Sequence, residues 1–326
     1  MTAILVIFTG GTIGSSLCNS EINTDASTHF LLLSQFQSRY PDVAIHFTTL
    51  KPYEILSENL MPIIWTTLIE TIEKANPAHY DGIIVTHGTD TLAYTAAALN
   101  FYFYASKTPI FLVSSQYPLS NEEANGLDNF SYAVGCIVNQ NLHGVFVPYK
   151  NPYTQNVTLH HGAHLTCSPQ LSSDFFSITP RHEHFFLREL EREKPLIPHF
   201  STRILLIKPF PGIDYTCFNL ENVDVVLHDL YHSGTACTTM AHGLTHSLRC
   251  FITQCHARNI DVFLAPALKS SNNYQSTLEL TRQGAKMIWN MTIEAAYVKL
   301  LLAYGNCGNA DDILYFLNDN IAGEQI

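Results

Sequence analysis

Continuous apolar runs recur in the first part of the chain, and each leads into a polar or glycine-containing segment. They read AILVIF at residues 3–8, GIIVTHG at 82–88, PIFLVSS at 109–115 and GVFVPY at 144–149. Continuous rather than alternating apolarity is typical of strands buried on both faces, as in a parallel sheet covered by helices. The four runs therefore predict strands of one buried sheet.

Helical patterns lie between these strands. The stretch PIIWTTLIETIEKAN, residues 62–76, has a proline near its start and apolar residues at helical spacing. Alternating strand and helix signals predict an α/β fold with a doubly wound, mostly parallel sheet.

A second series of strands and helices follows a polar, charged stretch at 181–199, RHEHFFLRELEREKPLIPH, which we expect to be a partly helical connector. The runs RILLIKPFPG (203–212), VDVVLHDL (223–230) and DVFLAP (261–266) predict strands, and MTIEAAYVKLLLAY (291–304) predicts a helix. Single cores seldom grow beyond about 250–300 residues. We therefore predict an N-terminal catalytic domain at 1–190, a linker at 191–202 and a smaller C-terminal α/β domain at 203–326.

Composition narrows the classes of function. The chain has 326 residues, of which 46% are hydrophobic and 14% charged, and this balance predicts a folded protein. A formal charge of −11 opposes the neutralisation of phosphates on which nucleic-acid binding depends, so we expect no nucleic-acid partner.

The cysteine spacing indicates no disulfide or zinc scaffold, and the first residues do not resemble a signal peptide. Eight cysteines are scattered without a CxxC pair, which argues against a zinc ribbon. The start, MTAILVIFTGG, lacks a basic region before its short apolar run, and no apolar run reaches the roughly 18 residues of a membrane span. We therefore expect a cytoplasmic protein with no membrane partner.

Two threonine-containing turns are the candidate catalytic segments. TGGTIG, residues 9–14, and HGTDT, residues 87–91, each follow a predicted strand. Ligands bind at the carboxyl ends of strands in open α/β sheets, so the two turns could face one cleft. Glycines let backbone N–H groups approach a negatively charged oxygen, and a threonine hydroxyl beside them could act as a nucleophile. The alternative is that both are ordinary turns, in which aspartate bonds its own backbone.

Five blocks in order, TGGTIG, HGTDTLAYTA, PLSNEEANGLDNFSYAV, LLIKPFPGI and MTIEAAYVKL, resemble the bacterial L-asparaginase family, especially its cytoplasmic type I branch. The resemblance covers nearly the whole chain. It implies hydrolysis of L-asparagine to aspartate and ammonia through a threonine-linked acyl-enzyme. On this resemblance Thr12 is the nucleophile, and Thr89 and Asp90 are the second catalytic threonine and the acid.

The same resemblance assigns the substrate contacts. The block LSEN implies Ser57 on the α-carboxylate of the substrate and Glu58 near its α-amino group. Backbone amides around Thr12 and Thr89 would hold the oxyanion, which would explain the glycines beside them, Gly88 included.

The active site departs from the family pattern where the family has a lysine paired with the acid. Cys167 stands at that position in HHGAHLTCSPQLSSDFF. A thiol cannot supply the positive charge, so Lys150, from a different loop path, or a histidine such as His161 or His164 would have to substitute.

Other departures also cluster around the expected pocket. The segment at 15–30 has no tyrosine, although many family members place one there, FLVSSQYPL replaces a T-G-S-like block, and Thr235 stands where related chains have an asparagine. Two hypotheses follow: an active amidohydrolase with a reorganised base, or a catalytically weakened protein on the same fold that binds an amino acid or a partner protein.

The resemblance also implies assembly. We expect a homodimer or homotetramer with active sites at a subunit contact. We expect no cofactor and no metal, because the sixteen histidines show no HExxH-like spacing. The expected ligand is a small amino acid.

Overall fold

The computed structural model describes residues 1–18, 21–24, 28–178 and 195–326. These residues form two compact units, and the division falls between Pro198 and His199. Most of the expected connector at 181–199, and the first four residues of the expected linker at 191–202, lie outside the described residues.

The first unit is built on a six-stranded sheet in the order β4-β1-β5-β6-β7-β8. All neighbours are parallel except β7 and β8, which are antiparallel. The strands are β1 (Thr2–Ile7), β4 (Ile45–Leu50), β5 (Gly82–Thr86), β6 (Ile110–Val113), β7 (Val145–Tyr149) and β8 (Thr158–His161).

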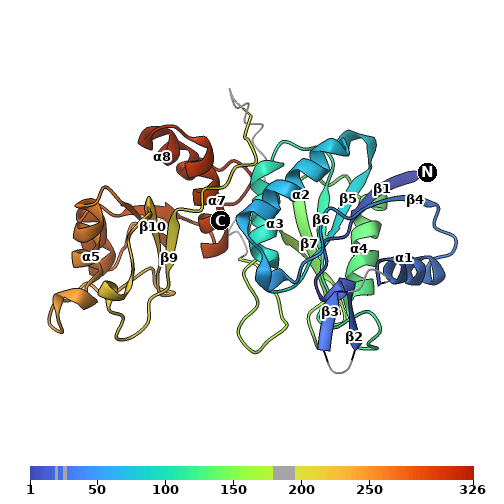
Figure 1. The fold of residues 1–326 in the computed structure, drawn as a ribbon, viewed down its shortest axis with the longest axis horizontal. Helices are drawn as coiled ribbons and strands as arrows, with labels where there is room; N and C mark the ends of the chain where they lie inside the picture. The colour runs from blue at the N-terminus through green and yellow to red at the C-terminus, as the bar shows by residue number, and fades with distance from the viewer. Residues whose placement is uncertain (19–20, 25–27, 179–194) are drawn as a thin grey trace. The chain divides into compact units, whose positions relative to one another are not determined.

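Helices cover both faces of this sheet. Figure 1 shows α1 (Thr28–Arg39) and α4 (Gly126–Asn139) on one face, and α2 (Pro62–Lys74) and α3 (Leu92–Tyr102) on the other. Alternate residues of a strand point to opposite faces. Accordingly Ile4 and Val6 of β1 join one core with Phe36 of α1 and Phe130 of α4. Strands β1, β5, β6 and β7 are buried on both sides, as their continuous apolarity predicts.

Short elements follow the strand ends that carry the candidate chemistry. The 3-10 helix η1 (Thr12–Gly14) follows β1 and leads into an antiparallel hairpin of β2 (Ser15–Cys18) and β3 (Glu21–Thr24). A second 3-10 helix, η2 (Ser57–Asn59), follows β4, and a third, η3 (Pro77–His79), precedes β5.

The second unit has a four-stranded, wholly parallel sheet in the order β12-β11-β10-β9. Its strands are β9 (Ile204–Ile207), β10 (Val225–Asp229), β11 (Asp261–Ala267) and β12 (Lys286–Trp289), and its helices are α5 (Leu248–His256), α6 (Gln275–Arg282), α7 (Ile293–Asn306) and α8 (Ala310–Asn318), with 3-10 turns η4 (Tyr215–Cys217) and η5 (Leu244–His246). Helix α5 packs on one face through Phe251 and Ile252, and Figure 1 shows α7 on the other. A fully buried ion pair, Lys299 with Glu324, ties α7 to the last residues.

The expected fold class is confirmed: a mostly parallel, doubly wound sheet precedes a smaller parallel α/β unit. Every strand and helix expected from an apolar run is present, with ends shifted by a few residues. Strands β2, β3, β4, β8 and β12 were not expected. β4 reads IHFTTL, and its polar, partly exposed side chains reflect its place at the sheet edge, where one-sided burial needs no continuous apolar run.

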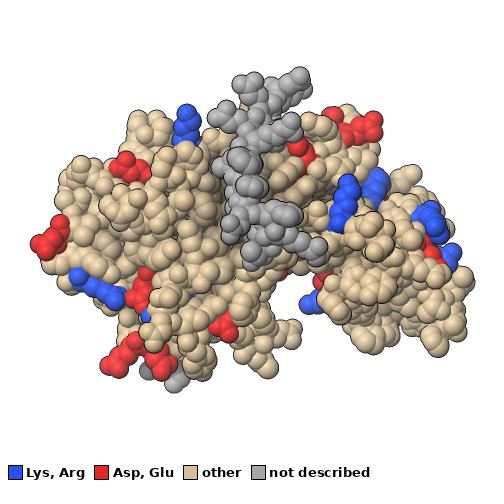
Figure 2. Space-filling model, turned by 180° about the vertical axis from the view of Figure 1, so that it is seen from behind, with Lys and Arg blue, Asp and Glu red and all other residues tan. Residues whose placement is uncertain are grey.

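Surface and composition features bear on possible partners. Within the described parts of the chain, no helix is both long and apolar enough to cross a membrane. Among the same residues, no group of three or more His, Cys, Asp or Glu side chains could hold a metal ion. On the face drawn in Figure 2, some lysines and arginines stand singly and others lie side by side, and acidic side chains are spread over the same face.

Candidate active site

The two threonine-containing turns pack directly against each other. Gly11 has a left-handed φ of 76°, and a Cβ at this position would lie 2.3 Å from the backbone nitrogen of Gly88. Upstream, the backbone N–H of Thr9 donates to Oγ1 of Thr86 at 3.2 Å. Only glycine permits this approach at position 11, so the contact explains why Thr12 follows a glycine.

A third loop joins the two turns. Ile55 donates its N–H to the carbonyl of Thr9 and accepts from the N–H of Gly11, both at 3.0 Å. This short ladder places η2, which begins two residues later, beside Gly88. A Cβ at Gly88 would lie 2.3 Å from Oγ of Ser57, which is 4% exposed. Residues far apart in sequence thus converge at the carboxyl ends of β1, β4 and β5, as the sheet rule predicts.

Ser57 is hydrogen-bonded to Asp90. Its Oγ donates to Oδ2 of Asp90 at 3.2 Å and accepts from the backbone N–H of Asp90 at 3.2 Å. Oγ1 of Thr91 donates to the carbonyl of Ser57 at 3.0 Å. Ser57 has a single hydroxyl proton, and it is directed at Asp90, whereas the resemblance implies a contact with the substrate α-carboxylate. Glu58, the next residue, is exposed.

A buried hydrogen-bond chain supports the second turn. Nδ1–H of His87 donates to the carbonyl of Gly88 at 2.7 Å, which leaves Nε2 as the acceptor for Oγ1–H of Thr95 at 2.9 Å. Nε1–H of Trp65 in turn donates to Oγ1 of Thr95 at 3.0 Å. Burial lowers the pKa of His87 to about 4, so its ring is neutral near pH 7 and this donor order is fixed.

A pocket of about 270 Å³ opens beside the second turn. Thr89 and Asp90 line one side, Gln116 and Phe175 line another, and the loop at 168–173 completes it. Thr12 begins η1 and is partly buried, and it is not among the residues that line this pocket. The structure therefore brings together the backbone turns of Thr12 and Thr89 with Ser57 and Asp90, and places a pocket next to Thr89.

The position of the family lysine is occupied by a thiol. Sγ of Cys167 lies 4.0 Å from the backbone carbonyl of Asp90, so the loop runs past the acid as the resemblance implies. Lys150 is engaged elsewhere: its Nζ lies 2.7 Å from Oδ2 of Asp128, whose other oxygen bonds Arg39 at 2.7 Å. Burial raises the pKa of Asp128, but the two cations outweigh it and hold that pKa below its usual value. Lys150 is thus the partner of a different carboxylate.

The two histidines considered as substitute bases pack together at the end of β8: His161 is its last residue, and His164 lies in the turn that follows. The rings of His161 and His164 have centroids 4.7 Å apart, and His161 also packs against Phe146 of β7. Burial lowers the pKa of His161 to about 3. The contacts described for His161 are therefore those of a neutral, partly buried side chain packed against other rings.

Sequence reasoning missed three parts of this site. The relay through His87, the side chain of Gln116 and the loop at 168–173 were not singled out as functional. Gln116 follows β6, and the general rule that ligands bind at the carboxyl ends of strands could have identified it. The loop carries no composition that marks it as a pocket wall.

Comparisons with known proteins agree with this geometry. Residues 3–180 match the family described as Asparaginase, N-terminal. The chain belongs to the asparaginase family. The family match makes this an amidohydrolase-type protein and accounts for the paired threonine turns.

Individual relatives extend the likeness to both units. The chain is 28% identical over 348 residues to a subunit of the glutamyl-tRNA(Gln) amidotransferase of Methanobrevibacter smithii, covering 98% of this chain and 76% of that protein. The corresponding protein of Metallosphaera sedula is 26% identical over 349 residues, with 98% and 76% covered.

Solved asparaginases share the fold. The thermostable L-asparaginase from Thermococcus kodakarensis has a TM-score of 0.80 and 22% identity, covering 100% of this chain and 99% of that one. L-asparaginase I from Vibrio cholerae has a TM-score of 0.78 and 23% identity, with the same coverage. At these identities the likeness establishes the fold of this asparaginase-family chain.

Proposed function

We propose that the protein hydrolyses the side-chain carboxamide of L-asparagine, with Thr12 as nucleophile and Thr89 and Asp90 as the supporting pair. The observation that carries the proposal is the direct packing of Gly11 against Gly88, because it brings the two threonine-bearing turns to one place beside a pocket. The N–H groups of Gly11 and Asp90 already donate to Ile55 and Ser57, so we assign the oxyanion to the backbone N–H groups of Thr12 and Thr89.

The proposed reaction has two balanced steps. Oγ of Thr12 attacks the carboxamide carbon, its proton passes to the leaving nitrogen, and ammonia departs from a threonine ester. Water then adds to the ester, one of its protons returns to Oγ of Thr12, and aspartate leaves as a carboxylate while the other proton passes to the released ammonia. A threonine hydroxyl needs help to lose its proton. We assign that help to Thr89 and Asp90, with Ser57 holding the carboxylate of Asp90.

Two alternatives have their own supporting observations. Glutamine is a second candidate substrate, because curated relatives are named as components of a glutamyl-tRNA(Gln) amidotransferase. One extra methylene is worth only about 1–3 kcal/mol of discrimination. A weakened, ligand-binding protein is favoured by the thiol of Cys167 beside Asp90 and by the engagement of Lys150 with Asp128.

Steady ammonia release tests the proposal. Wild-type protein and the variants Thr12→Ala and Thr89→Ala are assayed with L-asparagine and L-glutamine, each after a check of folding by circular dichroism. Thr49→Ala, at an exposed threonine of the edge strand β4, is the matched control. Release that persists in the control and falls at least 100-fold in both site variants supports the proposal. A folded wild type that binds asparagine without releasing ammonia supports the binding protein instead.

We further propose a homodimer or homotetramer in the cytoplasm. The support is the resemblance of the sequence to the cytoplasmic type I L-asparaginases, which implies such an assembly, and light scattering at micromolar concentration tests it. A single monomeric mass would contradict this part of the proposal.

A further inference from the structure

A second pocket adjoins the candidate catalytic pocket. Its volume is about 590 Å³, and it shares Gln116 and residues 171–173 with the pocket beside Thr89 and Asp90. Pockets for drug-sized ligands run to about 300–1,000 Å³. The volume of the second pocket alone falls within this range. Together with the catalytic pocket, it gives more volume than a free amino acid fills.

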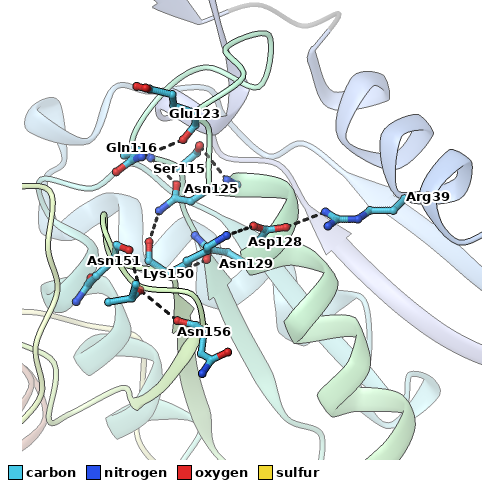
Figure 3. A network of polar contacts seen from close by, with 12 residues as sticks. Arg39, Ser115, Gln116, Glu123, Asn125, Asp128, Asn129, Lys150, Asn151 and Asn156 are labelled. Carbon is cyan, nitrogen blue, oxygen red and sulfur yellow. Dashed lines mark hydrogen bonds and ion pairs between the residues drawn. The ribbon is translucent and has the colours of Figure 1, made fainter.

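The base of the second pocket is rigid because its polar groups bond one another. Figure 3 shows Asp128 between Arg39 and Lys150, and Asn125 between Gln116 and Lys150. Asn125 accepts from the N–H of Gln116 at 2.9 Å and donates to the carbonyl of Lys150 at 2.8 Å. Among the described residues that line the pocket, the only lysine or arginine is Lys150, and Asp128 neutralises it within the wall.

The remaining charge on the walls is negative. Glu122, Glu123 and Asp174 line the pocket in addition to Asp128. Glu122 and Glu123 are exposed, and Figure 3 shows the carboxylate of Glu123 pointing away from the Asp128–Lys150 pair. A charged group that enters this space meets three carboxylates that no lysine or arginine of the described wall compensates.

Two tyrosines stand at the same pocket. Tyr117 is 40% exposed, and Tyr153 is fully exposed on a backbone with a left-handed φ of 66°. Aromatic faces attract cations, with about 0.5–1 kcal/mol for exposed pairs. Asp174 accepts a hydrogen bond from Oγ of Ser172 at 3.1 Å, which leaves its charge uncompensated. Aromatic rings together with uncompensated carboxylates are the chemistry that recognises an ammonium or guanidinium group.

We propose that this second pocket binds a positively charged extension of the substrate, so that the enzyme acts on a carboxamide linked to a cationic group rather than on free asparagine alone. This inference rests on the proposed function. The carboxamide enters beside Thr89, and the cation lies between the tyrosines and the carboxylates of Glu122, Glu123 and Asp174.

Charge-matched dipeptides test the assignment. The probes are L-asparaginyl-L-lysine and L-lysyl-L-asparagine, each compared with its glutamate counterpart, and L-asparagine is the reference. Ammonia release and, independently, binding by calorimetry are measured at low salt. The site variant is Glu122→Gln with Glu123→Gln. The control variant, Asp42→Asn with Glu221→Gln, removes the same charge at exposed positions elsewhere.

The expected result is that at least one lysine dipeptide has about a tenfold higher kcat/KM and tighter binding than its glutamate counterpart. This preference should collapse in the site variant, persist in the control variant, and leave turnover of L-asparagine unchanged. Charge-selective binding without ammonia release keeps the pocket assignment and contradicts the proposed hydrolysis. Hydrolysis of L-asparagine with no charge preference, or a preference unaltered in the site variant, overturns the pocket assignment.

Discussion

Oγ of Ser57 lies 3.2 Å from both Oδ2 and the backbone nitrogen of Asp90, so one hydroxyl holds the acid of the site at two points. Hydrogen bonds to charged groups contribute about 1.5–3 kcal/mol. Ser57→Ala removes both bonds and leaves Asp90 free to rotate. We expect kcat to fall about tenfold or more. The melting temperature should change little, because Asp90 is exposed.

Steady-state kinetics of Ser57→Ala and Ser57→Thr distinguish this role from direct substrate binding. If Ser57 only held the substrate α-carboxylate, Ser57→Ala would raise KM and leave kcat unchanged. That outcome would contradict the positioning role.

Gly88→Ala should disable the site through a steric conflict. Its new Cβ would lie 2.3 Å from Oγ and 2.6 Å from Cβ of Ser57, so η2 must move. We expect a loss of ammonia release of at least 100-fold and a free energy of unfolding lower by about 1–3 kcal/mol, the range for overpacking.

Gly135→Ala is the matched control for Gly88→Ala. Gly135 lies within α4, and a Cβ there meets no atom within 4 Å. Alanine favours a helix over glycine by about 1 kcal/mol, so urea unfolding should show a gain in stability with unchanged activity. Normal activity in Gly88→Ala would show that the turn and η2 do not need their present contact.

Cys167→Lys should increase the rate of ammonia release. Sγ of Cys167 is 4.0 Å from the carbonyl of Asp90, so a lysine at this position can bring its ammonium to the acid. A nearby cation favours deprotonation of a hydroxyl relay. We expect about a tenfold higher kcat, measured beside Cys167→Met as a control of similar length without charge. An unchanged rate in a folded Cys167→Lys would mean that the relay already has another base.

Stability should fall on acidification because buried histidines must stay neutral. Burial lowers the pKa of His87 in the first unit and of His228 in the second to about 4. In the unfolded chain these side chains titrate near 6.5, so as pH falls through 6.5 the unfolded state binds protons first. Stability is therefore complete above about pH 6.5 and is lost down to about pH 4, by up to ~3 kcal/mol for His87 at about 1.4 kcal/mol per pKa unit.

Urea unfolding at pH 7 and pH 5 measures this loss. His87→Gln should reduce the difference between the two pH values, whereas His143→Gln, at an exposed histidine, should leave it unchanged. A wild-type stability that is equal at both pH values would contradict the account.

The central strands of the sheet could be predicted because the pattern that marks each of them lies within its own residues. Runs such as residues 3–8 and 82–86 are apolar at nearly every position. Such continuous apolarity is required only of strands that are covered on both faces. Edge strand β4 lacked the signal because its exposed positions tolerate polar residues such as His46 and Thr49.

The threonine turns were predictable for the same reason, since each follows such a run. The contact of Ser57 with Asp90 was not, because it depends on how Ile55 pairs with Thr9 and Gly11 across strands that are distant in sequence. The engagement of Lys150 by Asp128 likewise depends on the packing of α4 beside β7. Such contacts are set by tertiary geometry, for which a single sequence carries no local signal.

The most direct test of the account is to trap the acyl-enzyme. Wild-type protein is mixed with L-asparagine, quenched in acid within the first turnover, and analysed by peptide mapping with mass spectrometry while released ammonia is measured in parallel. The account predicts an acyl group on the peptide that contains Thr12, absent in Thr12→Ala, together with steady release of ammonia. Ammonia release with the acyl group on another residue, or binding of asparagine with neither product, would contradict it.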